Sequence, residues 1–347
     1  MSRAKAYAAM SPAAPLQPWT FERREPGEKD VRIEIAFCGI CHSDLHTVRD
    51  EWGPARYPIV PGHEIAGRVV EVGRKVTKFK AGDLAGVGCL VESCRKCANC
   101  KRGLQQHCLG PVSFTYNSLE KDGKTATQGG YSSHIVVDEA FALKLAAKQP
   151  LERVAPLLCA GITTYSPLKR FGAGTGTTVG VLGLGGLGHM GVKLAAAMGA
   201  EVVVLSGSSS KKADAKRLGA HDFVLTSDGD AMSKNGGRLD LIVDTVSGQH
   251  DIAAALGLLK TAGTLALVGA SPLPLSLPAF PLIMGRRQIA GSLIGGLKET
   301  QEMLDFCAKK KVLADVEVIA PRDINASYER LLKGDVRYRF SIDASKL

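Results

Sequence analysis

Four cysteines stand close together in the chain, and they restrict its fold more than any other feature. They are Cys94, Cys97, Cys100 and Cys108, with the spacing C-x2-C-x2-C-x7-C. A short loop with this spacing can fold back and direct four sulfur atoms at one centre. Four thiolates that close tetrahedrally around one ion form a structural zinc site, which leaves no position open for chemistry. The run therefore predicts a zinc-holding lobe at about residues 89–110.

Two other kinds of site also use clustered cysteines. In iron–sulfur motifs the last cysteine usually follows at a shorter spacing and precedes proline. Four cysteines within fifteen residues permit only short, strained disulfide pairings. Lys96, Lys101 and Arg102 would also offset the negative charge of four thiolates around Zn²⁺. Structural zinc is therefore the preferred interpretation.

A second set of metal-binding residue types is scattered along the chain. Cys41 lies in the segment 38–46, His63 and Glu64 follow in Pro-Gly-His-Glu, and Cys159 comes much later. Two cysteines and one histidine that leave a fourth position open are the ligands of a catalytic zinc, which polarises an alcohol or a carbonyl. Taken singly, none of these residues is persuasive, because a lone cysteine is more often a small buried apolar residue.

A glycine-rich turn provides a third signal. Residues 177–199 read as a buried β-branched strand, a turn and a helix, and the turn contains Gly183-x-Gly185-x-x-Gly188. Such glycines permit a tight turn, close approach of the backbone to a pyrophosphate, and close packing of helix on strand. The bare motif is weak evidence, but Glu201-Val-Val-Val-Leu-Ser206 supplies the next parallel strand. The sequence predicts dinucleotide binding by Gly183, Leu184, Gly185, Gly186, Leu187 and Gly188.

The end of that second strand indicates which coenzyme is used. NAD enzymes place an acidic residue there, about twenty residues beyond the glycines, to bind the ribose hydroxyls. Here the strand runs into Ser-Gly-Ser-Ser-Ser-Lys-Lys at residues 206–212, and the nearest acid is Asp214. The missing carboxylate removes repulsion toward a 2′-phosphate, while hydroxyls and a lysine supply donors. This favours NADP(H); a solvated loop would not explain the absent acid.

Taken together, these segments resemble the zinc-dependent medium-chain alcohol dehydrogenases, and more narrowly the cinnamyl-alcohol-dehydrogenase-like branch. The matching strings begin near residue 31 and reach the C-terminus, so the resemblance covers most of the chain. They are residues 38–46, 61–65, the four-cysteine lobe, 157–167, 183–190 and 335–340.

The resemblance implies roles for residues around the catalytic zinc. Ser43 matches the hydroxyl that begins the family's proton relay and His46 matches its outlet, although a surface helix histidine is the alternative for His46. Asp44 resembles the carboxylate that orients ligand His63. Glu64 is a conditional ligand, which in the family can approach zinc when the site is unoccupied. Zinc bound there acts as a Lewis acid while hydride passes between alkoxide and nicotinamide.

The resemblance also implies contacts with coenzyme and substrate. Expected NADP contacts besides the glycine turn are Ser206, Ser208, Lys212, Thr163, Ser292 and Ile294. The expected substrate pocket is formed by Trp52, Phe114 and Leu293. Two positions depart from the branch: Gly207 interrupts its usual serines and removes one hydroxyl contact, and Gly191 replaces its usual alanine. Cys38, Cys89 and Cys307 are expected in the core, and His189 is expected to pack.

The chain length predicts more than one domain, because 347 residues exceed the size at which a single core keeps growing. Short β-type runs separated by glycine and proline fill residues 31–150, and strands alternate with helices from about 152. The expected class is α/β. The resemblance implies a GroES-like β-barrel catalytic domain at 1–151, a doubly wound parallel Rossmann domain that binds NADP at 152–295, and a return to the catalytic domain at 296–347.

Composition narrows the class of function. The net charge is +10, but acidic residues are interspersed and only Lys309–Lys311 forms a basic run. This favours a soluble basic enzyme that attracts an anionic cofactor over a nucleic-acid binder. The N-terminus lacks the pattern of a signal peptide, and apolar stretches fall short of membrane length. Nine cysteines, mostly assigned to metal, suit a reducing cytosol, so we expect a cytoplasmic protein.

The leading hypothesis is an NADP(H)-dependent alcohol dehydrogenase with two zinc ions per chain. It would act on small-molecule alcohols and aldehydes, mainly as a broad-range aldehyde reductase, and family analogy suggests a homodimer. A polyol-type zinc dehydrogenase normally has an acid where Ser206–Ser208 stands, and a zinc-independent quinone reductase would lack the zinc ligands. A zinc-ribbon nucleic-acid-binding protein would leave the glycine turn and the second ligand set unexplained.

Overall fold

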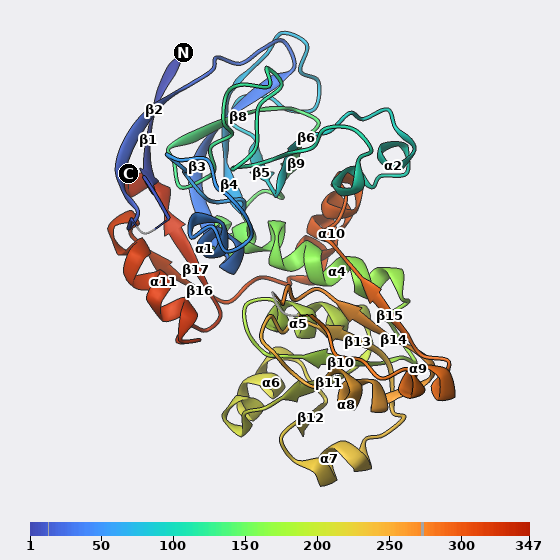
Figure 1. Ribbon diagram of the computed structural model, residues 1–347. Coiled ribbons are helices and arrows are strands. Elements are labelled where there is room, and N and C mark those ends of the chain that lie inside the picture. Colours follow the sequence, from blue (N-terminus) through green and yellow to red (C-terminus); the bar gives the residue numbers. More distant parts are fainter. Residues whose placement is uncertain (13, 272–273) are drawn as a thin grey trace. The chain divides into compact units, whose positions relative to one another are not determined.

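The chain folds into two compact units in the computed structural model, which describes residues 1–12, 14–271 and 274–347 (Figure 1). The first unit comprises Met1–Cys159 together with Gly295–Leu347, and the second comprises Ala160–Ile294. We expected the first part to end at residue 151, but the compact unit extends to Cys159. Cys159 therefore belongs to the same unit as Cys41 and His63.

The first unit is built around a mostly antiparallel sheet. Its strands run in the order β16-β17-β3-β4-β5-β9, and β8 pairs with β3. These strands are β3 (Asp30–Ile40), β4 (Ile65–Val72), β5 (Leu84–Val87), β8 (His134–Asp138), β9 (Ala142–Lys144), β16 (Val316–Ile319) and β17 (Arg339–Asp343). A hairpin of β1 (Ser2–Ala8) and β2 (Gln17–Arg23) and a pair formed by β6 (Leu90–Glu92) and β7 (Ser113–Phe114) lie outside it.

The helices of this unit are short except in the last fifty residues. They are α1 (His42–Val48), α2 (Ala98–Lys101), α3 (Leu151–Val154), α10 (Leu297–Lys310) and α11 (Ile324–Leu332), with 3-10 turns at Gln105–His107, Ala155–Leu158, Pro321–Asp323 and Ala344–Lys346. The C-terminal segment completes the sheet, because β17 pairs antiparallel with β3 and brings Phe340 opposite Ile40. Both side chains are fully buried, so the end of the chain is part of the core beside β3.

The second unit is a parallel sheet with the order β12-β11-β10-β13-β14-β15. The strands are β10 (Thr178–Leu182), β11 (Glu201–Ser206), β12 (Asp222–Leu225), β13 (Leu239–Asp244), β14 (Leu259–Leu267) and β15 (Gln288–Gly291). The helices are α4 (Ala160–Arg170), α5 (Gly188–Met198), α6 (Lys212–Leu218), α7 (Gly229–Lys234), α8 (Ile252–Gly257) and α9 (Phe280–Gly285), with a 3-10 turn at Ser209–Lys211.

Strand order and burial explain where this unit binds a ligand. Every residue of β10 is buried, as expected of a β-branched strand that is covered on both faces of a parallel sheet. The first strand, β10, lies between β11 and β13, so the connections leave it in opposite directions. In such sheets, ligands bind beyond the carboxyl ends of the strands at this reversal, which is where the glycine turn follows β10.

Within the described residues, no helix has the length and apolarity that a membrane span requires.

Candidate active site

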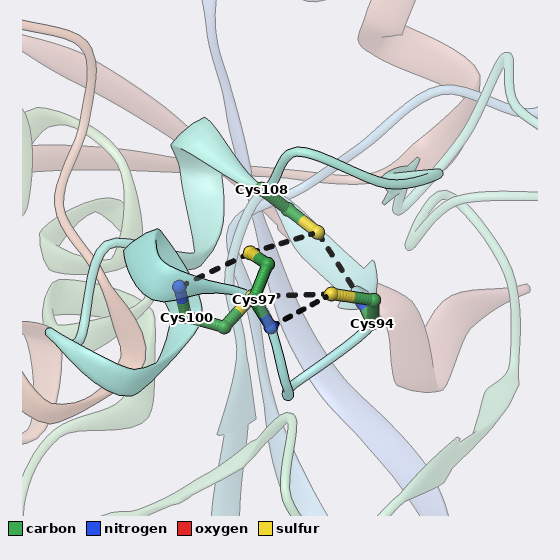
Figure 2. A group of neighbouring side chains, drawn as sticks. All are labelled: Cys94, Cys97, Cys100 and Cys108. Atoms are coloured by element: carbon green, nitrogen blue, oxygen red, sulfur yellow. Dashed lines mark hydrogen bonds between the residues drawn. The ribbon is translucent and has the colours of Figure 1, made fainter.

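The four cysteines of the lobe converge on one point (Figure 2). The Sγ atoms of Cys94 and Cys100 are 4.0 Å apart and those of Cys97 and Cys108 are 3.9 Å apart. A tetrahedron with zinc–sulfur bonds of about 2.3 Å has sulfur–sulfur edges of about 3.8 Å. All nine cysteines of the chain are free thiols, which excludes the disulfide alternative in this structure.

Backbone amides donate hydrogen bonds to these sulfur atoms and lower the pKa of Cys94 and Cys97, whereas burial raises the pKa of Cys100 to about 11. The N–H groups of Cys100 and Leu109 donate to Cys97 Sγ at 3.5 and 3.4 Å, and that of Gly110 donates to Cys108 Sγ at 3.3 Å. The amide of Leu109, followed by that of Cys100, lowers the pKa of Cys97 to about 6. Zinc binds cysteine as the thiolate, so the donor set and its geometry fit a closed zinc site.

A second group of metal-binding side chains is buried in the same unit. The ligand atoms of Cys41, His63, Glu64 and Cys159 all lie within 4.8 Å of one another. Cys41 ends β3 and caps α1, His63 and Glu64 immediately precede β4, and Cys159 follows the 3-10 turn that packs against Gly86 and Gly88. Residues far apart in sequence thus meet inside the first unit and offer two sulfurs, one nitrogen and one carboxylate.

Glu64 is held by a buried arginine that our sequence reasoning missed. Arg339 on β17 donates to Glu64 Oε1, and both side chains are almost fully buried. The other carboxylate oxygen, Oε2, is buried without a hydrogen-bond partner among the described residues. Burial raises the pKa of Glu64 to about 8, although the charge of Arg339 opposes this shift. This unpartnered oxygen lies near the two thiols, so it is available to bind a metal there. That agrees with the expectation that Glu64 is a conditional ligand.

Ser43 and His46 lie on the same short helix, α1, and face different surroundings. The Ser43 hydroxyl donates to Cys41 Sγ at 3.0 Å and lies 3.4 Å from His63 Nε2, so it contacts the ligand group directly. One turn further on, His46 Nδ1 hydrogen-bonds Glu51 and its ring stacks on Trp52 at 5.0 Å. The expectation named no partner for His46; the structure supplies Glu51.

Asp44 is fully buried and directs the imidazole of His63. Its Oδ1 accepts from His63 Nδ1 and from the N–H of Gly62, both at 3.0 Å, and its Oδ2 accepts from the N–H of Cys41 at 2.9 Å. With Nδ1 occupied as a donor, Nε2 of His63 is the nitrogen available to a metal. The same carboxylate therefore fixes both Cys41 and His63.

The glycine turn has the three features that the motif requires. Gly183 has φ +88°, a conformation that side-chain-bearing residues rarely adopt. A Cβ at Gly185 would meet nothing within 4 Å, so the turn is open to a ligand there. A Cβ at Gly188 would lie 2.1 Å from the carbonyl oxygen of Gly183, so α5 can approach β10 only without a side chain. The turn fits a pyrophosphate.

The predicted NADP contacts after β11 differ in how exposed they are. Ser206 is buried at the strand end, where its hydroxyl accepts from the N–H of Ser208 at 3.3 Å. Ser208 and Lys212 are exposed, and the Ser208 hydroxyl lies 2.8 Å from that of Ser210. A Cβ at Gly207 would meet only Thr226 Oγ1, at 3.7 Å, so a serine would fit there.

The remaining predicted residues lie in both units. Thr163 on α4 is buried and its hydroxyl has no partner among the described residues, as expected of a side chain that awaits a ligand. Ser292, Leu293 and Ile294 follow the carboxyl end of β15; Leu293 is exposed and Ile294 is buried. Trp52 and Phe114 are exposed residues of the first unit.

The structure also tests the expectation that three further cysteines and His189 are buried in the core. Cys38 and Cys307 are fully buried, as expected of core residues, and so is His189. Cys89 is only partly buried, and interaction with the thiol of Cys159 lowers its pKa. The expectation that Cys89 is a simple core residue is therefore wrong, because β5 ends beside the segment that carries Cys159.

Comparison with known proteins identifies the family. Residues 27–147 match the family described as alcohol dehydrogenase GroES-like domain, and residues 186–309 match the zinc-binding dehydrogenase family. The chain belongs to the zinc-binding alcohol dehydrogenases. Its two units are accordingly the GroES-like and Rossmann-like parts of the medium-chain dehydrogenase fold, as expected, and the chain is a zinc-containing oxidoreductase rather than a zinc-ribbon nucleic-acid-binding protein.

Individual members of this dehydrogenase family are similar over their whole length. The NADP-dependent alcohol dehydrogenase C 1 of Mycolicibacterium smegmatis is 56% identical over 100% of this chain and 99% of that protein. The cinnamyl alcohol dehydrogenase SbCAD4 of Sorghum bicolor superposes with a TM-score of 0.96 at 44% identity, covering 99% and 98% of the two chains. The cinnamyl alcohol dehydrogenase of Helicobacter pylori, solved with NADP(H), superposes with a TM-score of 0.93 at 45% identity over 99% of each chain.

Proposed function

We propose that this protein interconverts primary alcohols and aldehydes with NADP(H), mainly as a broad-range aldehyde reductase. One observation carries the proposal: a hydroxyl, that of Ser43, contacts a buried Cys–His–Cys group in a chain that also presents a dinucleotide-binding turn. The relatives support the coenzyme and the reaction, since one is named as an NADP-dependent alcohol dehydrogenase and two as cinnamyl alcohol dehydrogenases.

Each residue of the group has a separate task. Cys41, His63 and Cys159 would hold a zinc ion, which supplies Lewis acidity toward the alcohol or carbonyl oxygen. The Ser43 hydroxyl accepts the alcohol proton and passes on its own. His46, hydrogen-bonded to Glu51, is the outlet of this relay. Glu64 is a conditional ligand, and Asp44 holds His63 in the required orientation.

The second zinc ion has a structural role. Cys94, Cys97, Cys100 and Cys108 would hold it through four thiolates, which leaves no position for substrate. Loss of this ion would leave four thiolates close together, and their repulsion would open the lobe.

The coenzyme site combines the glycine turn with residues at the ends of other strands. Residues 183–188 receive the pyrophosphate, and Ser206, Ser208 and Lys212 receive the 2′-phosphate. Lys212 is exposed and supplies the positive charge, whereas the buried Ser206 orders the loop through Ser208. Thr163, Ser292 and Ile294 contact the nicotinamide half. Trp52, Phe114 and Leu293 provide apolar surface for the substrate.

The proposed assembly is a homodimer in the cytoplasm. Nine free thiols suit a reducing compartment. Strand β15 is the last strand of its sheet, and next to it α9 exposes Phe280, Ile283 and Met284. An open sheet edge flanked by exposed apolar side chains is suited to pairing with the same edge of a second copy.

The decisive experiment measures kcat/KM together with zinc content. A charge-assisted contact is worth about 1.5–3 kcal/mol, so NADPH should be preferred over NADH by roughly 10- to 100-fold with benzaldehyde, cinnamaldehyde or butyraldehyde. Cys159→Ser should abolish turnover but keep the fold, whereas Cys97→Ser should lose one zinc ion and stability. Equal use of NADH, or faster turnover of a polyol with NADP⁺, would favour the polyol-dehydrogenase alternative; one zinc ion per wild-type chain would contradict the two-site assignment.

A further inference from the structure

The Asp44 carboxylate accepts more hydrogen bonds than the one from His63 that orients the imidazole ring. Besides the two backbone N–H groups and His63 Nδ1, its Oδ2 accepts a hydrogen bond from the Tyr131 hydroxyl at 3.2 Å. A second phenol stands behind the first, because the Tyr328 hydroxyl donates to that of Tyr131 at 3.4 Å. Tyr328 lies on α11, 284 residues from Asp44 in sequence (328 − 44), so this chain of donors joins the C-terminal segment to the zinc site.

The environment keeps both phenols protonated. Tyr131 and Tyr328 are at least nine-tenths buried. Burial, followed by the charge of Asp44, raises the pKa of each well above its ordinary value. They therefore remain hydrogen-bond donors throughout the range in which an alcohol dehydrogenase works. Packing alone would be served equally well by phenylalanine, and in that case neither hydroxyl would be aimed at an acceptor.

We propose that Tyr131, supported by Tyr328, is a positioning residue that limits how strongly Asp44 polarises His63. A carboxylate that accepts from a metal-bound histidine raises the basicity of the ring and its donation to the metal. Each additional donor to that carboxylate takes up part of its charge and weakens this effect. Tyr131 thereby keeps His63 a moderate ligand and the metal strongly electrophilic. The inference rests on the proposed role of His63 as a zinc ligand.

Removal of the Tyr131 hydroxyl should make the site hold zinc more tightly, whereas a substitution that merely disturbed the packing would make it release zinc faster. In Tyr131→Phe, Asp44 keeps its other donors and holds His63 more strongly, so zinc should leave more slowly when a chelator competes for it. The bound alcohol should become less acidic, so the pH midpoint of kcat for alcohol oxidation should rise. Outer partners of metal ligands typically change affinity or activity 10- to 100-fold, and Tyr131 lies one contact further out. We expect roughly three- to tenfold for each readout.

Tyr328→Phe is the matched control, since it removes a phenol that acts only through Tyr131. Hydrogen bonds in a chain strengthen one another by a fraction of each bond, so this variant should show a smaller change in the same direction. The double variant Tyr131→Phe/Tyr328→Phe should equal Tyr131→Phe alone. Other titratable groups around the network are unchanged in all three variants: Cys38, His42, Cys89, Glu64, Arg339 and Tyr116.

The outcomes separate this inference from the proposed function. Slower zinc release with a raised pH midpoint in Tyr131→Phe, and a non-additive double variant, would support it. Faster zinc release with an unmoved pH profile would show that the phenol merely packs, and would overturn it, as would additive effects of the two substitutions. If wild-type protein holds no zinc that Cys159→Ser removes, the proposed function itself fails, which metal analysis shows before any tyrosine variant is made.

Discussion

Among single residues, Ser43 has the most demanding placement in the proposed relay, because its hydroxyl would have to contact both the zinc ligands and the substrate. It donates to Cys41 Sγ and lies 3.4 Å from His63 Nε2. We expect Ser43→Ala to bind zinc and coenzyme but to lose roughly 10²- to 10⁴-fold in kcat/KM for alcohol oxidation, the usual worth of a positioned proton-transfer group. Ser43→Thr keeps the hydroxyl and should restore most of the rate.

His46 provides the comparison at the same scale. It lies further out, hydrogen-bonded to Glu51, where water can partly replace it. His46→Ala should therefore lose less activity than Ser43→Ala in kcat/KM for alcohol oxidation. Near wild-type oxidation by Ser43→Ala at pH 7, with zinc content confirmed, would mean that water reaches the alcohol directly and that the relay assignment is wrong.

At the scale of elements, helix α5 carries two glycines with opposite requirements. A Cβ at Gly191 would lie 3.4 Å from Val181 Cγ1 and 3.7 Å from Thr164 Cγ2, which are ordinary contacts. An alanine at this position would thus fit, and it would remove the entropic penalty of a glycine inside a helix. We expect Gly191→Ala to raise the free energy of unfolding by about 0.8–1 kcal/mol in urea titrations.

Gly188→Ala is the matched control for that prediction. Its Cβ would lie 2.1 Å from the carbonyl oxygen of Gly183, so α5 must move away from β10. This variant should be destabilised and should bind coenzyme poorly. A loss of stability in Gly191→Ala would instead indicate that α5 needs the extra space at that position.

At the scale of the whole molecule, the open edge of the parallel sheet governs the predicted assembly. Ile283 on α9 is 67% exposed beside β15. Loss of a hot-spot contact costs about 2 kcal/mol or more of binding free energy, which is about 30-fold in the dissociation constant. Sedimentation equilibrium should show a dimer for the wild-type protein and a weakening of at least this size for Ile283→Asp. Val318→Asp, an exposed apolar position in the other unit, should leave the dimer unchanged; a monomeric wild type would refute the proposal.

Local patterns were sufficient for the zinc lobe and the coenzyme turn. Cys94 and Cys108 are separated by only a short loop, and the spacing of their run already determines which sulfurs can meet. Gly183 and Gly188 belong to one strand–turn–helix segment, so their conformational requirement is visible in the letters. The local alternation of strands and helices likewise indicated a parallel sheet, but its strand order, β12-β11-β10-β13-β14-β15, comes from the structure.

Tertiary structure alone decided what surrounds the buried ligand group. Arg339 contacts Glu64 across 275 residues of sequence. Tyr328 reaches Asp44 through Tyr131, which is 197 residues from Tyr328 and 87 residues from Asp44 in the sequence. Nothing in the local pattern of β17 or α11 specifies these partners, because each depends on the C-terminal segment returning beside β3. Ligand types are a property of the sequence, whereas the charges and donors that tune them arise only where distant segments pack together and bury these side chains.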